Sequence, residues 1–350
     1  MGMIRQNMVK IIGGEFAIED SMLDNHRVGE NSFDRAYYSS GRCAFYAILK
    51  DIERTSGKNR ILLPNYLCDS VTKVVMDTGW EFLFYNINCK MEAELSDLYS
   101  KIDGPYTVVL LINYFGMSDL GKVINRIRCI PDVTIIVDNV QATYAAALEN
   151  IDYSFNSYRK WFPCPDGAVA KKYTEGEILD IQFGINNFVK YKYAGNLLKQ
   201  YRKIVDDDVI LELLNKGEEQ LDSHYLCKCS ENSNHILSNL DKNRIATIRK
   251  NNARILHEEL IDLEIDHIYD ETTVPLFIPI LIENRDYVKK QFYDNGIFTP
   301  THWNYVSDHY NGENILYEKE LSLIVDQRYT EEDMIRQINI LKKLKTKGMI

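Results

Sequence analysis

The first half of the chain alternates short, continuously apolar runs with stretches whose apolar residues recur at helical spacing. The apolar runs occupy residues 61–66, 81–87, 107–116 and 133–139. The helical stretches occupy residues 41–57, 68–79 and 118–130. Apolar strands that alternate with helices are typical of a mostly parallel sheet covered on both faces. We therefore predict an α/β fold whose ligand binds where the strands end.

The second half predicts a smaller α/β unit, and 350 residues suffice for two domains. Helical patterns cover residues 230–262, 285–296 and 330–345, and strand-like runs cover residues 274–282 and 296–303. Residues 171–229 show no clear period. We predict a large domain over residues 1–245, including an N-terminal arm, and a small C-terminal domain over residues 246–350.

Composition excludes several classes of protein. The net charge of −10 argues against a nucleic-acid binder. No apolar run reaches the roughly 18 residues that span a bilayer, and the first residues lack the apolar core of a signal peptide. Seven cysteines without a CxxC pair predict reduced thiols in a cytoplasmic protein. No metal is expected, because the spacing of the His and Cys residues fits no common zinc site; these residues are His224, Cys227, Cys229 and His235.

Two ionisable residues stand just after predicted strands. Asp138 ends the run TIIVD, and a buried acid there needs a cation. The protonated ring nitrogen of pyridoxal phosphate (PLP) is one such cation, while a helix cap or a Mg²⁺ ligand are alternatives. Lys160 follows 22 residues later. Burial or nearby cations would lower its pKa and let it form a Schiff base, whereas the alternative is a surface lysine on a loop.

Other residues fit a cofactor that carries a phosphate. Ser40 and Gly41 open the first predicted helix, where free N–H groups favour an anion, although simple capping is the alternative. Ser157 lies three residues before the lysine. Gln141 is placed to donate to a ring oxygen, and Tyr66, after a strand end, is placed to stack on a ring face.

These segments, in this order, resemble the DegT/DnrJ/StrS-type aminotransferases, a branch of the fold-type-I PLP enzymes that mostly act on nucleotide-linked keto sugars. The likeness covers roughly residues 10–345. It rests on SSGRCAFYAIL, LPNYLCDSV, LLINYFG, VDNVQA and the lysine segment followed by DGAVA, and in the second half on NLDKNRIATIRKNNARIL, FIPILI and GIFTPTHW.

The resemblance implies pyridoxal 5'-phosphate as the cofactor and a homodimer as the assembly. Lys160 would hold the cofactor and shuttle the proton, Asp138 would pair with the ring nitrogen, and Gln141 would contact the ring hydroxyl. The implied cofactor-binding set also contains Ser40, Gly41, Arg42, Tyr66 and Ser157. The family also has a dehydratase branch, in which a histidine replaces the lysine. The lysine at position 160 therefore points to transamination.

The sequence also departs from the family pattern. Phe155 stands where the family usually has a serine, and Cys68 stands where its stacking aromatic residue falls. The Gly-Tyr-Asn-x-Arg segment that reaches the partner subunit's site has no clear counterpart. A basic stretch, NNFVKYKYAGNLLKQYRK, lies near its place.

Four residues are predicted to bind substrate. Arg328 or Arg159 would clamp the carboxylate of the amino donor, unless the first forms a domain-packing salt bridge. His302 would line the substrate entrance, unless it is a packed core histidine. Lys192 lies in the basic run of residues 190–203, which would either hold a pyrophosphate across a dimer interface or form a solvated helix face.

Together these features predict a homodimeric PLP aminotransferase. It would transfer an amino group from an amino acid such as glutamate to a keto sugar, which the resemblance implies is nucleotide-linked. Two alternatives remain open at this point. One is an aminotransferase acting on a non-nucleotide ketone, and the other is a non-catalytic protein that keeps the fold.

Overall fold

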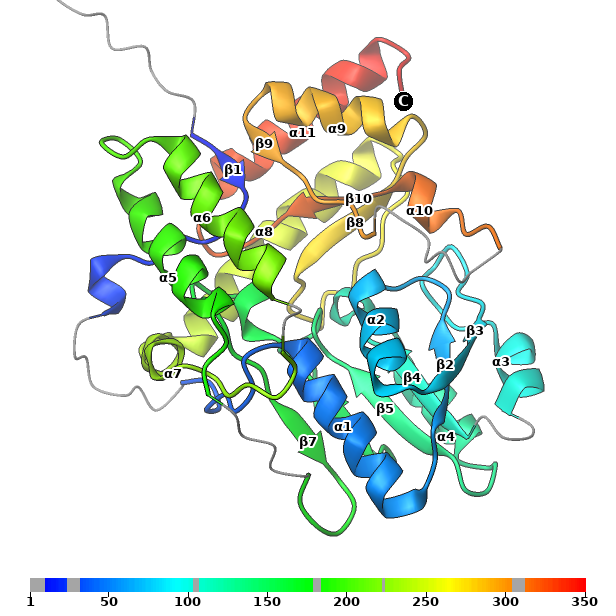
Figure 1. Cartoon of the computed structure of the whole chain (residues 1–350). Coiled ribbons are helices and arrows are strands. Elements are labelled where there is room, and N and C mark those ends of the chain that lie inside the picture. Colours follow the sequence, from blue (N-terminus) through cyan, green and yellow to red (C-terminus); the bar gives the residue numbers. More distant parts are fainter. Residues whose placement is uncertain (1–9, 24–31, 103–106, 179–183, 222–223, 304–311) are drawn as a thin grey trace, which may run out of the picture.

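A computed structural model describes residues 10–23, 32–102, 107–178, 184–221, 224–303 and 312–350 (Figure 1). Its main sheet has the strand order β3-β2-β4-β5-β6-β7. All neighbouring strands are parallel except β7, which is antiparallel to β6. The strands are β2 (Arg60–Pro64), β3 (Glu81–Tyr85), β4 (Val108–Ile112), β5 (Thr134–Asp138), β6 (Tyr153–Phe155) and β7 (Ala170–Lys172). The predicted, mostly parallel sheet is confirmed.

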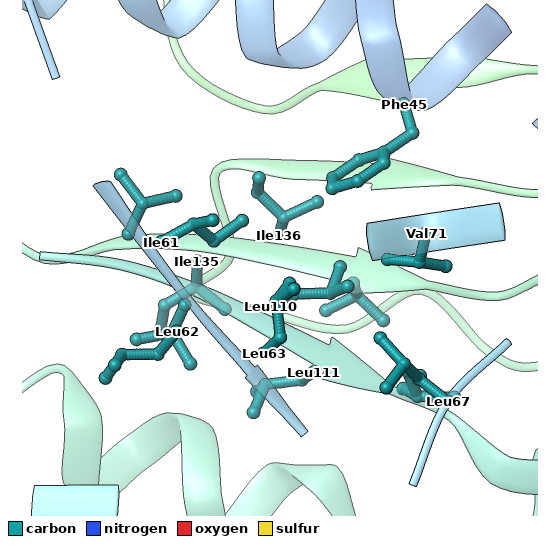
Figure 2. Packing of buried hydrophobic residues seen from close by; sticks show 14 of the residues in the cluster. Phe45, Ile61, Leu62, Leu63, Leu67, Val71, Leu110, Leu111, Ile135 and Ile136 are labelled. Atoms are coloured by element: carbon teal, nitrogen blue, oxygen red, sulfur yellow. The ribbon is translucent and has the colours of Figure 1, made fainter. Parts of the chain in front are cut away.

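Helices cover this sheet, which explains why its strands read as continuous apolar runs. All five residues of β4 are buried. Figure 2 shows Phe45 reaching from α1 onto the sheet, above Ile136 of β5. Each such buried side chain stabilises the fold by about 1.5–3 kcal/mol. The helices of this half are α1 (Gly41–Ser56), α2 (Asp69–Thr78), α3 (Leu95–Ile102) and α4 (Leu120–Ile127).

The segment without a clear period contains a helical hairpin, α5 (Phe188–Leu198) and α6 (Asp207–Gln220). Two glycines let these helices approach closely. A Cβ atom on Gly195 would lie 2.7 Å from Leu214 Cδ2, and one on Gly217 would lie 2.8 Å from Lys192 Cγ. Close contacts between the two helices therefore hold the hairpin together. The next helix, α7 (Glu231–Ser238), follows it.

The second half forms its own apolar core around two small sheets. One pairs β8 with β10 in antiparallel fashion, and the other pairs β1 with β9 in parallel. The elements are β1 (Ile12–Gly13), α8 (Lys242–Asp262), β8 (Phe277–Leu281), α9 (Arg285–Asp294), β9 (Ile297–Phe298), α10 (Leu316–Lys319), β10 (Glu320–Ile324) and α11 (Glu331–Thr346). Among the described helices, none is long and apolar enough to cross a membrane.

The predicted boundary between residues 245 and 246 falls inside α8. The N-terminal strand β1 also adds to a sheet of the second half, so the two halves share segments from both ends of the chain. The division into domains of residues 1–245 and 246–350 stays a prediction.

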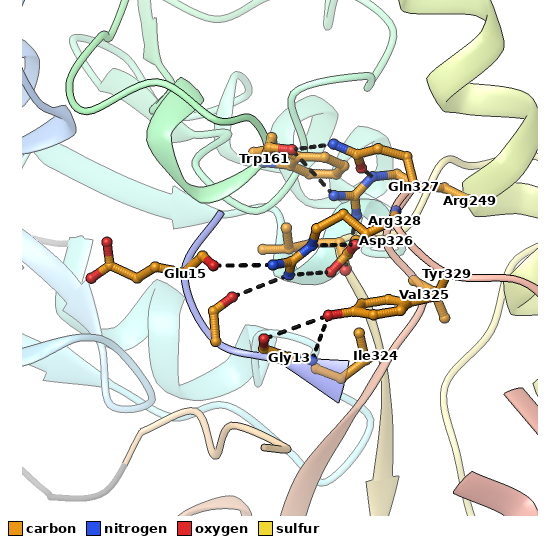
Figure 3. Close-up of polar contacts among 12 residues, drawn as sticks. Gly13, Glu15, Trp161, Arg249, Ile324, Val325, Asp326, Gln327, Arg328 and Tyr329 are labelled. Atoms are coloured by element: carbon orange, nitrogen blue, oxygen red, sulfur yellow. Dashed lines mark hydrogen bonds and ion pairs between the residues drawn. The ribbon is translucent and has the colours of Figure 1, made fainter. Parts of the chain in front are cut away.

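Residues 13–16, here called the N-terminal strap, are anchored to the second half (Figure 3). Arg328 donates from Nη1 to the carbonyl of Glu15 and from Nη2 to the carbonyl of Gly14, both at 3.1 Å. It also forms an ion pair with Asp326, with 2.7 Å between Nη2 and Oδ2. The guanidinium lies 4.1 Å from the ring centroid of Phe16. One side chain thus holds the strap through its charge, its hydrogen bonds and its planar face.

Replacing Arg328 with Ala is expected to lower the free energy of unfolding by roughly 2–4 kcal/mol, because it leaves the buried Asp326 without its cation. Urea unfolding of the cofactor-free protein measures this loss. The matched control is Arg254→Ala, which removes an exposed ion pair with Glu258 within α8 and should change stability by less than about 0.5 kcal/mol. Equal losses for the two variants would contradict the anchoring role of Arg328.

Candidate functional site

A cavity of about 150 Å³ lies where the strands of the main sheet end and α1 begins. It is called the smaller cavity below. Parallel strands bring their carboxyl ends to one edge of a sheet, so residues far apart in the sequence meet there. The residues predicted from the sequence that line this cavity are Ser40, Gly41, Arg42, Asp138, Gln141, Ser157, Arg159 and Lys160.

Asp138 and Lys160 both line the smaller cavity, where the charge of each acts on the pKa of the other. Asp138 ends β5 and is only 7% exposed, and its Oδ1 accepts a hydrogen bond from the backbone N–H of Val140 at 2.8 Å. Burial raises the pKa of Asp138 to about 6, although that hydrogen bond and the charge of Lys160 act to lower it. Burial also lowers the pKa of Lys160, with opposing effects from Cys68 and Asp138. A lysine amine with a lowered pKa is the form that attacks a carbonyl.

Gln141 offers an unused hydrogen-bond donor at the same place. Its side chain is 2% exposed, and its Oε1 accepts from the backbone N–H of Phe115 at 3.3 Å. Its Nε2 has no hydrogen-bond partner within the described part of the chain. A buried amide hydrogen is costly to leave unpaired, so this donor points to a ligand acceptor in the cavity.

The first turn of α1 lies against Ser157. A Cβ atom on Gly41 would be 3.4 Å from Ser157 Cβ and 3.2 Å from Val140 Cγ2, so any other residue here would require Val140 to shift by a few tenths of an ångström. Ser40 Oγ accepts a hydrogen bond from the backbone N–H of Cys43 at 3.3 Å. Ser40 therefore caps α1, which is the alternative role predicted for it. The remaining free N–H groups of the helix start suit an anion such as a phosphate.

Tyr66 is placed differently from the expectation that it stacks on a cofactor ring. Its side chain is fully buried and packs against Trp303, with ring centroids 4.9 Å apart, and it does not line the smaller cavity. Tyr66 follows the end of β2, and its side chain points into an aromatic core beside Tyr114 and Tyr317. Cys68, which stands where the family's stacking aromatic residue usually falls, lines the cavity instead, together with Trp303.

A second cavity of about 400 Å³, the larger cavity, shares Arg159 and Lys160 with the smaller one. Its walls come from the N-terminal strap, the hairpin of α5 and α6, and the second half of the chain. All four residues predicted to bind substrate line it, namely Arg159, Lys192, His302 and Arg328. The two cavities therefore form adjoining sites joined at the lysine.

The partners of these four residues differ. Arg328 is committed to Asp326 and to the strap, which matches the alternative of a packing salt bridge. His302 Nδ1 lies 2.9 Å from Ser322 Oγ, so it is both packed and at the cavity wall. Arg159 Nη1 donates to Glu218 Oε1 at 3.0 Å. Among these residues, Arg159 has the smallest set of protein partners within the described chain.

Lys192 is only 1% exposed and does not lie on a solvated helix face, so that alternative for the basic run is wrong for this residue. Its Nζ lies 2.5 Å from Glu15 Oε1 and 2.6 Å from Glu218 Oε1. The sequence pattern missed both glutamates, because an isolated Glu in a polar stretch carries no signal of its own. Among the described residues, no group of three or more His, Cys, Asp or Glu side chains could hold a metal ion.

No family model and no curated protein matches the sequence. Solved structures do match its fold. A DegT/DnrJ/EryC1/StrS aminotransferase from Brucella abortus has 16% identity and a TM-score of 0.64, over 89% of this chain and 86% of its own. A protein from Streptococcus pneumoniae, described as a sugar aminotransferase in its PLP form, has 11% identity and a TM-score of 0.66, over 98% and 94%.

A third similar structure, of DesI in the presence of its TDP-sugar product, has 12% identity and a TM-score of 0.64, over 91% of this chain and 82% of its own. Identities this low show the fold and leave the reaction to be argued from the site. The predicted fold, that of the fold-type-I aminotransferases, is confirmed, and the similar structures include the family whose motifs the sequence resembles.

Proposed function

We propose that this protein is a PLP-dependent aminotransferase that moves an amino group from an amino acid to a keto sugar. One observation carries the proposal. A half-buried lysine and a buried aspartate share one cavity at the carboxyl edge of a parallel sheet, beside an unpaired amide donor. The arrangement suits a ring that carries an aldehyde, a basic nitrogen and a hydroxyl.

The residues of the smaller cavity fit PLP. Lys160 would bind the aldehyde carbon as a Schiff base, Asp138 would pair with the ring nitrogen, and Gln141 Nε2 would donate to the ring hydroxyl. The start of α1 and Ser157 would hold the phosphate, with Arg42 at the same wall. When bound, PLP supplies an electron sink for the carbon that carries the amino group.

The protein's own groups would do the rest. The Lys160 amine takes and returns the proton at that carbon, a role for which its lowered pKa is suited. Asp138 would place a negative charge against the ring nitrogen and so would keep that nitrogen protonated. The apolar residues of the larger cavity, among them Phe162 and Phe277, exclude water from the reacting atoms.

The proposal also covers the amino donor, the assembly, the location and the acceptor. Arg159 stands between the two cavities and is the better candidate for the donor's carboxylate, because Arg328 is committed to the strap. Glutamate is the expected donor. A homodimer and a cytoplasmic location are supported by the family resemblance and by composition, respectively. A nucleotide-linked acceptor is supported by the same resemblance.

The test is spectroscopic. Purified protein loaded with PLP should be yellow, and glutamate should bleach its absorbance band while 2-oxoglutarate accumulates in a single turnover. Adding a panel of keto sugars should then restore the band. A yellow protein that responds to no amino acid would instead favour the non-catalytic alternative.

A further inference from the structure

The imidazole ring of His302 lies in the wall of the larger cavity, which Lys160 also lines. The side chain of His302 is only 12% exposed. The rings of Phe115 and Phe277 pack against the imidazole, each with a distance of 5.3 Å between ring centroids. These contacts hold the plane of the imidazole ring, so the partners of its two nitrogen atoms can be considered separately.

One of these nitrogen atoms faces β10. Side chains two residues apart on a strand point to the same side, which places Glu320 and Ser322 together. The backbone N–H of Ser322 donates to the carbonyl of Pro300 at 3.0 Å, and so the segment before His302 runs beside the strand. His302 Nδ1 lies 2.9 Å from Ser322 Oγ, and that hydroxyl donates to Glu320 Oε1 at 2.6 Å. The other carboxylate oxygen, Oε2, accepts from the backbone N–H of His302 at 2.5 Å.

This chain of hydrogen bonds determines which ring nitrogen carries the proton. Glu320 and Ser322 are fully buried. An ionised carboxylate can only accept hydrogen bonds, so Ser322 gives its single hydroxyl proton to Glu320 and accepts from the Nδ1–H of His302. Nε2 of the neutral ring then holds a free electron pair, and it has no partner among the described residues. The carboxylate, 3.7 Å from Nδ1, would stabilise the positive charge that the ring gains with a second proton.

Amino transfer needs such a base in addition to Lys160. The Lys160 amine acts at the carbon that carries the amino group, but water must also be added when the donor leaves as a ketone and be released when the acceptor ketone reacts. We propose that His302 is the catalytic residue that moves the protons of this water, and that Ser322 and Glu320 are its positioning residues. This inference rests on the proposed function and adds a reaction step to the place at the substrate entrance predicted for His302.

The step balances with water as its co-reactant. On the donor side, Nε2 takes a proton from water while the water oxygen bonds to the carbon, and the ring passes this proton to the nitrogen. The second proton of the water follows the same path. The bonds between carbon and nitrogen break with their electrons on the nitrogen, the oxygen ends as a carbonyl, and His302 returns to its starting state. The acceptor passes through these events in reverse.

His302→Gln separates the two proton transfers. In a single turnover of the PLP-loaded protein with glutamate, stopped-flow absorbance follows the bleaching that depends on Lys160, and a coupled dehydrogenase follows free 2-oxoglutarate, whose release needs water. The variant should bleach at a rate within about threefold of the wild type but release 2-oxoglutarate about 10²-fold more slowly, because a positioned acid–base group contributes about 10²–10⁴-fold. His224→Gln, which changes an exposed histidine, is the matched control and should alter neither rate.

A second measurement needs neither cofactor nor substrate. Ring-nitrogen NMR of the cofactor-free protein, at a pH where His302 is neutral, should find the proton on Nδ1. Ser322→Ala should move this proton toward Nε2 and slow the release of 2-oxoglutarate by at least about tenfold, with bleaching unchanged.

Three results would overturn the proposal. They are a wild-type release rate in His302→Gln, equal slowing of bleaching and release in that variant, as damage to the fold would cause, and a proton on Nε2 in the wild type. A wild type that glutamate does not bleach is a different result, which would instead count against the proposed function itself.

Discussion

Lys160→Ala is expected to lower the kcat of amino transfer by at least about 10³-fold. The substitution removes both the amine that would bind the cofactor and the base that would move the proton, and positioned proton transfer alone contributes about 10²–10⁴-fold. Single-turnover absorbance changes with glutamate measure the loss. The loss should be the same at every donor concentration, because the group acts on the reacting carbon rather than on binding.

The matched control is Lys190→Ala, which removes an exposed lysine of α5. Its kcat should stay within about twofold of the wild type. If Lys160→Ala kept more than a tenth of the wild-type rate, the amine at position 160 would have no catalytic role. Added methylamine should restore part of the lost rate, since it can replace a missing lysine amine as a proton acceptor.

Asp138→Asn is expected to have opposite effects on activity and on the stability of the cofactor-free protein. Activity should fall by roughly 10²-fold or more, because the neutral amide cannot hold the ring nitrogen in its protonated form. The backbone hydrogen bond from Val140 can persist, since the amide keeps an oxygen at Oδ1.

The stability effect follows from the sign of the pKa change. The pKa of Asp138 is raised from 3.8 to about 6, so the folded protein binds this proton more tightly than the unfolded chain does. Stability therefore falls as the pH rises from about 4 to about 6, and stays lower above that range. The difference corresponds to about 3 kcal/mol. Cofactor-free Asp138→Asn should be more stable than the wild type by up to this amount at pH 8.

Urea unfolding at pH 4 and at pH 8 measures the effect. The advantage of the variant should vanish near pH 4, where the wild-type carboxyl is protonated. Asp262→Asn, an exposed aspartate of α8, is the matched control and should show no such pH dependence. A variant that is less stable than the wild type at pH 8 would show that Asp138 already has a compensating partner in the cofactor-free protein.

The strands of the main sheet could be predicted because each is buried on both faces and therefore reads as an unbroken apolar run. The same reasoning placed Asp138 and Lys160 at one edge, since parallel strands end together. The hairpin of α5 and α6 could not be predicted in this way. Its helices are held by the close approach at Gly195 and Gly217, a contact that no local period reveals.

The site was predictable only where a residue's role follows from its place along a strand or a helix. Tyr66 shows the limit, because the sequence places it near a strand end but does not say that its ring turns into the aromatic core. Glu15 and Glu218 lie at opposite ends of the first 220 residues and meet only through Lys192. Only tertiary packing brings these three residues together, and it places the buried ammonium group of Lys192 between the two glutamates.

The proposed function requires the amine of Lys160 to bind the aldehyde of PLP. Reduction of the PLP-loaded protein with borohydride, followed by mass spectrometry of its peptides, locates this bond. We expect a single pyridoxyl adduct on Lys160, and none on the neighbouring cationic side chains of the two cavities. An adduct on another lysine, such as Lys192, or a protein that retains no adduct at all, would contradict it.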